Sequence, residues 1–73
     1  MKKRSENLKK FGKKIIKLRR QKGFTSQMAF ANRANMDRTY IGGIERGERN
    51  PTFEIIEKLA KTLEISMEEL FKF

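Results

Sequence analysis

The side chains of this sequence that could do chemistry are cations, carboxylates, hydroxyls and amides, because Cys and His are absent. The chain therefore has no thiolate nucleophile, no disulfide, no zinc site of the common ligand set and no imidazole to act as a general base. The neighbouring carboxylates Glu68 and Glu69 are interpreted as the first turn of a helix. We expect a protein that is not an enzyme and uses no metal, cofactor or small-molecule ligand.

The polar residues with the most informative spacing belong to two short predicted helices, 27–34 and 38–46, which a three-residue turn at 35–37 joins. This is the spacing of a helix-turn-helix. Ile41 and Ile44 face the core, so the opposite side of the second helix is free. That side offers hydrogen-bonding groups and bare backbone to base edges in a DNA major groove, namely Arg38, Thr39, Gly42, Gly43 and Arg46.

The charge of the chain indicates a polyanionic partner. Eighteen Lys and Arg against nine Asp and Glu give a net charge of +9. Residues 1–22 carry +10, residues 23–49 carry +1 and residues 50–73 carry −2. Such a field attracts nucleic acid to the first two-thirds of the chain and leaves the last third for another surface. No apolar run reaches the length of a membrane span, so we expect a cytoplasmic protein with no membrane partner.

Hydrophobic spacing predicts an all-α fold in which five helices form one compact domain over residues 1–73, with residues 1–4 as a loose basic arm. The first helix runs from about Ser5 to Lys22, and Gly23 ends it. Good N-cap residues precede the other four helices: Ser26, Asp37, Thr52 and Ser66. The fourth helix is expected to bury Phe53, Ile56, Leu59, Ala60 and Leu63.

Two charged residues fall on apolar helix faces. Arg19 follows Ile15 by four residues in the first helix, and Glu45 lies on the inward side of the third helix beside Ile41. A charge on a buried face needs a partner of opposite sign. The sequence therefore predicts a structural ion pair between Arg19 and Glu45 that fixes the two helices relative to each other.

The end of the chain is apolar and can be interpreted in two ways, as closure of the core or as a patch for a second copy. The residues concerned are Met67, Leu70, Phe71 and Phe73. A small core without disulfides or metal rarely supplies more than about 3 to 5 kcal/mol, so association would help. Because this third of the chain is also the least useful to DNA, we place a homodimer surface there.

The motifs together resemble the Cro/lambda-repressor type helix-turn-helix DNA-binding domain, also called XRE-like. The resemblance covers about residues 8–71 and rests on Ser26-Gln27, Ala31, Tyr40-Ile41, Ile44-Glu45-Arg46-Gly47, Asn50-Pro51 and the capped helix from Ser66. Within the family, the run from Asp37 to Ile41 followed by Gly43 to Arg46 looks most like the controller proteins of restriction-modification systems. Three features depart from the family pattern: one extra residue between Gly23 and Gln27, Asn35 in place of Gly, and the glycine pair inside the recognition helix.

The resemblance implies residue roles. Arg38, Thr39 and Tyr40 would meet base edges, while the phosphate backbone would be held by Gln27, Arg46, Arg49 and Asn50. The family also commonly dimerises near its last helix. For Tyr40, packing on Phe30 or Met36 is as good an interpretation as contact with a base.

We therefore expect a sequence-specific transcriptional regulator that binds double-stranded DNA as a homodimer at a pseudo-palindromic operator, and that could serve as a restriction-modification controller. Within the same fold, a phage-type or chromosomal repressor and an antitoxin are alternatives. From another class, the basic first helix would suit a non-specific RNA- or membrane-surface-binding module. That module lacks the exposed aromatic residues that such proteins usually use.

Overall fold

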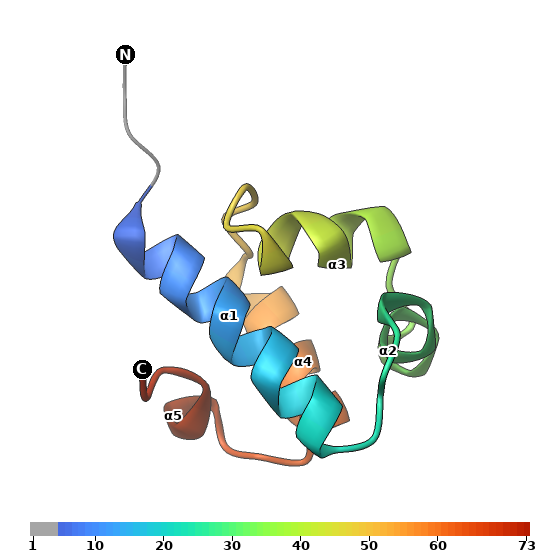
Figure 1. Cartoon of the computed structure of the whole chain (residues 1–73). Helices are drawn as coiled ribbons and strands as arrows, with labels where there is room; N and C mark the ends of the chain where they lie inside the picture. The colour runs from blue at the N-terminus through green and yellow to red at the C-terminus, as the bar shows by residue number, and fades with distance from the viewer. Residues whose placement is uncertain (1–4) are drawn as a thin grey trace.

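The computed structural model describes residues 5–73, and the predicted basic arm at 1–4 lies outside them. Five α-helices follow one another along the chain (Figure 1): α1 Glu6–Gln21, α2 Gln27–Ala34, α3 Arg38–Glu45, α4 Phe53–Leu63 and α5 Met67–Leu70. The predicted all-α, five-helix fold is confirmed. Helices α2 and α3 form the helix-turn-helix, and α1 contacts both α3 and α5.

Each helix begins at a side chain that accepts a hydrogen bond from a free backbone N–H of the first turn. These caps are Ser5, Ser26, Asp37, Thr52 and Ser66. The bond from Ala29 N to the Ser26 hydroxyl, for example, is 3.0 Å long. Four N–H groups at a helix start lack an intrahelical partner, so a short polar side chain in extended backbone stabilises the start. The predicted caps are confirmed.

Left-handed residues end two of the helices. Asn35, with φ of 57°, closes α2 and turns the chain toward α3, as its tolerance of this region predicts. Glu64, with φ of 59°, closes α4 in the same conformation, which was not predicted because Glu has no special preference for it. Asn35 thus begins the turn that leads to α3, and Glu64 begins the connection that leads to α5.

One hydrophobic cluster lies at the centre of the helices. Its fully buried large side chains are Phe30, Ile15, Ile41, Ile44, Leu59, Leu63 and Leu70. The expectation that Phe53 is buried is wrong, since its side chain is 66% exposed. Phe53 is the first residue of α4, and along that helix burial increases through half-buried Ile56 to buried Leu59. The apolar spacing of α4 therefore extends one turn beyond the core.

Gly12 brings the backbones of α1 and α3 into contact. A Cβ atom at position 12 would lie 2.4 Å from the carbonyl oxygen of Glu45 and 2.5 Å from that of Ile44. Real Cβ atoms do not approach backbone atoms so closely, so any larger residue would force the helices apart. Gly12 thus sets the position of the C-terminal end of α3.

None of the helices that the structure describes has the length and apolarity needed to span a bilayer.

Candidate nucleic-acid interface

The candidate interface is the side of α3 that faces away from the core. Arg38 and Thr39 are exposed in its first turn, directly after the cap Asp37. Tyr40 is half-buried and packs against the hydrophobic core. Arg46 caps the C-terminal end and is exposed. Two hydrogen-bonding side chains thus stand at the start of the free side, and a cation stands at its end.

Gly42 and Gly43 do not present bare backbone on this side, so that expectation is corrected. Both residues are buried. A Cβ at Gly42 would lie 3.1 Å from Nη1 of Arg46 and 3.4 Å from Oε1 of Gln27, whose side chains lie over it. Gly43 is covered in the same way by Arg49. The two glycines therefore lie beneath longer polar side chains, which would have to move before a base could reach the backbone of either glycine.

Arg49 lies over α3 although it belongs to the loop that follows. Its guanidinium carbon is 5.4 Å from the centre of the Tyr40 ring, within the range of a cation–π interaction. The backbone N–H groups of Glu48 and Arg49 both donate to the carbonyl oxygen of Gly43, at 2.8 and 3.2 Å. Loop and helix are therefore bonded to each other at the same residue that Arg49 covers.

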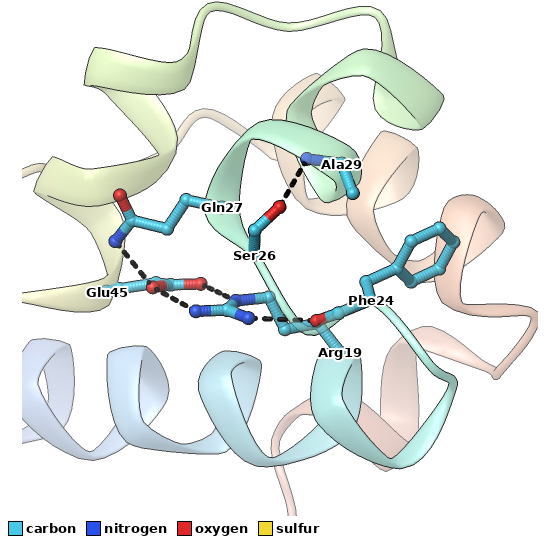
Figure 2. Close-up of polar contacts among 6 residues, drawn as sticks. All are labelled: Arg19, Phe24, Ser26, Gln27, Ala29 and Glu45. Carbon is cyan, nitrogen blue, oxygen red and sulfur yellow. Dashed lines mark hydrogen bonds and ion pairs between the residues drawn. The ribbon is translucent and has the colours of Figure 1, made fainter.

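The predicted ion pair between Arg19 and Glu45 is confirmed (Figure 2). Nε of Arg19 lies 2.6 Å from Oε2 of Glu45, and Nη2 lies 3.4 Å from Oε1. The two side chains are only 6% and 2% exposed. Arg19 also donates from Nη1 to the carbonyl oxygen of Phe24, at 2.9 Å. One buried guanidinium thus ties together α1, α3 and the loop that precedes α2.

Gln27 completes this network. Its Nε2 donates to Oε1 of Glu45 at 2.8 Å, so the first residue of α2 is bonded to the last residue of α3 (Figure 2). The amide is half-buried, and its Oε1 lies over Gly42. The longer turn before Gln27 is held by Arg19 at Phe24 and by the Ser26 cap. Gln27 is consequently oriented by the buried pair, with its remaining hydrogen-bonding capacity beside α3.

Cations gather around the end of α3. Arg46 pairs through Nε with Oε1 of Glu48 at 3.0 Å, and both side chains are about half exposed. A pair this exposed contributes little to stability, so Arg46 can exchange Glu48 for a phosphate oxygen. Lys9 packs against the same loop, because a Cβ at Gly47 would be 2.9 Å from its Cα and 3.0 Å from its Cγ. Lys9 was not predicted at this site. The residues that could have indicated it are Gly12 and Gly47, which let the backbone of α1 approach α3 and the loop that follows it.

The apolar C-terminal residues divide into buried and exposed sets. Leu70 has no exposed surface and belongs to the core, so its expected place on an exposed dimer patch is corrected: α5 turns it inward between α1 and α4. Met67 is half-buried against the core. Phe71 and Phe73 are 49% and 50% exposed.

Phe71 and Phe73 line an open groove of about 420 Å³ on the side of the molecule where α5 meets α1. Phe71 stacks on Phe11 with ring centres 5.6 Å apart. The full lining is Ser5, Asn7, Leu8, Phe11, Asn50, Pro51, Ile56, Phe71 and Phe73. Asn50, expected at the phosphate backbone, is thus found in the wall of this groove.

A helix-turn-helix family model matches residues 15–70, which is most of the chain. The chain belongs to the helix-turn-helix family, in its Cro/lambda-repressor type. Among similar proteins, control protein C.MunI of Mycoplasma sp is 44% identical over 62 residues, covering 85% of this chain and 84% of its own. Control protein C.BamHI of Bacillus amyloliquefaciens is 40% identical over 63 residues, covering 86% and 78%.

Solved structures of restriction-modification controllers have the same fold as this chain. The restriction-modification controller C.AhdI from Aeromonas hydrophila superposes with a TM-score of 0.87 at 45% identity, over 92% of this chain and all of that one. The controller C.Esp1396I, solved as a tetramer in complex with its natural 35-base-pair operator, gives a TM-score of 0.82 at 43% identity, over 93% of this chain and 88% of that one. The expected resemblance to restriction-modification controllers is confirmed.

Proposed function

We propose that this protein is a sequence-specific transcriptional regulator, the controller of a restriction-modification system, which binds a pseudo-palindromic operator as a homodimer. The observation that carries the proposal is the free side of α3, where Arg38 and Thr39 are exposed in the first turn. Further along the same helix, polar side chains lie over Gly42 and Gly43. Control proteins among its relatives and the operator-bound tetramer of C.Esp1396I support it.

Arg38 supports a DNA partner on electrostatic grounds. It lies in the first turn of α3, where the partial positive charge of the helix end disfavours a cation. An anionic duplex removes that disadvantage, and guanidinium groups bind guanine edges in a bidentate manner. In the proposal, Arg38 and Thr39 read bases, Tyr40 meets a base from its half-buried position, and Gln27, Arg46, Arg49 and Asn50 bind phosphates.

The homodimer is proposed to form through the groove beside α5. Phe71 and Phe73 leave half of their surface exposed there, next to the apolar lining from Leu8 and Ile56. All of the lining residues are uncharged, and residues 50–73, which supply five of them, carry a net charge of −2, so this groove adds little repulsion between two basic chains. Half-buried Met67 and buried Leu70 would contribute indirectly, because they pack α5 against the core.

Domain organisation, location in the cell and the lack of catalysis are part of the same proposal. Residues 1–73 act as one domain in the cytoplasm, and the protein works by binding rather than by catalysis. Membership in a family of DNA-binding regulators supports this, as does the lack of Cys and His in the chain.

A selection of bound duplexes from random DNA at physiological salt tests the proposal. We expect enrichment of a two-fold symmetric motif whose half-sites are about 34 Å apart, one turn of DNA. Enrichment of an asymmetric site would contradict the dimer. No enrichment would contradict the regulator and favour a non-specific binder of RNA or membrane surfaces.

A salt series then separates specific from non-specific binding. If each of two subunits neutralises about three to five phosphates, the log-log slope of affinity against salt is roughly −5 to −9, at about 0.9 per phosphate. A scrambled duplex of equal length is the control, and it should bind more weakly with a comparable or steeper slope. Coincident curves at every salt concentration would refute sequence-specific binding.

A further inference from the structure

Gly43 sits in the middle of the recognition helix, where glycine is a poor choice. Glycine in a helix interior is less favourable than alanine, because it loses more backbone freedom on folding. The φ angle of Gly43 is ordinary for a helix, so backbone conformation does not require glycine there. A different constraint must explain the residue.

That constraint is the side chain of Arg49. A Cβ at position 43 would lie 2.5 Å from Cγ of Arg49, and 3.4 and 3.5 Å from its Nε and Cδ. The close atom is in the middle of the side chain, next to a backbone that two hydrogen bonds to the carbonyl oxygen of Gly43 hold in place. The tip of the side chain cannot relieve this overlap by rotating. The whole side chain of Arg49 would have to leave the helix.

Gly42 makes a useful contrast. The atoms nearest to a Cβ there are the ends of two flexible side chains, at 3.1 and 3.4 Å. Those ends can shift by a few tenths of an ångström. Of the two glycines, only Gly43 faces an overlap that displaces a cation.

We infer that Gly43 is a positioning residue for Arg49: the missing Cβ lets Arg49 lie flat on α3, stacked on Tyr40, so that its guanidinium is in place for a DNA phosphate before the duplex arrives. This inference rests on the proposed DNA-binding function. A free arginine side chain must be ordered when it binds, whereas one already held loses less freedom. Packing the long side chain of Arg49 against a glycine orders that side chain before DNA binds.

The test is a double-mutant cycle with Gly43→Ala, Arg49→Ala and the double variant, measured as affinity for the selected operator. Gly43→Ala should weaken binding by about three- to tenfold per subunit, the cost of ordering one such side chain. The salt dependence should change little, because a displaced Arg49 still reaches its phosphate once it is ordered, whereas Arg49→Ala should make it shallower by about one phosphate per half-site. In the Arg49→Ala background, Gly43→Ala should have no effect on affinity, because the residue it positions is gone.

Two measurements on the DNA-free protein keep the inference separate from folding and from the proposed function. Alanine should leave thermal stability unchanged or raised, as its helix preference predicts. Tyr40 is the only tyrosine of the chain and there is no Trp, so its fluorescence and ring-proton shifts report whether the guanidinium remains stacked. Both signals should change in Gly43→Ala and resemble those of Arg49→Ala.

Unchanged tyrosine signals in Gly43→Ala would overturn the inference whatever the DNA result. Equal losses from Gly43→Ala in both backgrounds would also overturn it, because Gly43 would then act on DNA without Arg49. If no duplex is selected at all, the proposed function fails, yet the tyrosine signals still decide whether Gly43 positions Arg49.

Discussion

Removing either partner of the buried pair between Arg19 and Glu45 should nearly unfold the protein. Both side chains are more than nine-tenths buried, and their shortest N–O distance is 2.6 Å. Leaving one such charge without its partner typically costs about 3 to 5 kcal/mol. At about 0.05 to 0.15 kcal/mol per residue, a domain of this length has only about 4 to 11 kcal/mol in total. Arg19→Met or Glu45→Leu should therefore lose a large part of the free energy of unfolding.

The double variant is expected to recover most of that loss. Replacing a whole buried pair by apolar residues of similar size is often neutral or stabilising, because no charge is left unsolvated. Recovery should be incomplete, since the Phe24 carbonyl loses the donor Nη1 of Arg19 and Gln27 loses its acceptor on Glu45.

Urea unfolding followed by helical circular dichroism measures all three variants. Glu69→Gln is the control, because Glu69 pairs with Lys14 at 3.6 Å while 40% exposed, and such pairs are worth about 0 to 1 kcal/mol. Single variants at Arg19 or Glu45 that lose less than about 1 kcal/mol would refute the argument. So would a double variant whose loss equals the sum of the single losses.

Three further expectations concern the interface and the packing. Arg38→Ala should reduce discrimination at one base position per half-site by about 1 to 3 kcal/mol, whereas Arg46→Ala should lower the affinity for all duplexes nearly equally. Competition binding that gave the reverse pattern would contradict the proposed docking of α3 on DNA. Phe73→Asp should yield folded monomers in sedimentation, and a dimer that survived this change would place the interface elsewhere. Leu70→Ala, in the core, should instead lower the free energy of unfolding by about 2 to 5 kcal/mol. Gly12→Ala should destabilise the fold by about 1 to 3 kcal/mol in urea despite the better helix propensity of alanine, and an unchanged midpoint would show that α1 and α3 can separate freely.

Local signals in the sequence were enough to predict the helices and their starts. The Ser26 hydroxyl accepts from a backbone N–H three residues ahead, so the bond depends on its immediate neighbours alone. The pair between Arg19 and Glu45 was also predictable, although 26 residues separate the partners, because each charge interrupts an apolar helix face. Interruptions of a periodic pattern carry information about distant contacts.

Which side chains lie over the free side of α3, and which C-terminal apolar side chains are buried, could not be predicted from such local signals. Helical spacing puts Gly43 on the free side of α3, and only the return of the following loop puts Arg49 over it. Leu70 and Phe71 are adjacent apolar residues at the end of the chain, yet one is buried and the other half exposed. Successive residues of a helix point in directions about 100° apart, so the way α5 packs against α1 and α4 decides which of the two faces the core.

The backbone contact at Gly12 has a consequence for motion. Helices that meet through side chains can slide past each other by small rotamer changes, which is how sheared domains move. Carbonyl oxygens of α3 that lie directly against a glycine of α1 have no such layer to rearrange. The two helices should therefore behave as one rigid body, whose central amide hydrogens exchange with solvent only when the whole domain opens. Any flexibility that a duplex exploits must then reside in long side chains and in the loop after α3, rather than in a tilt of the recognition helix.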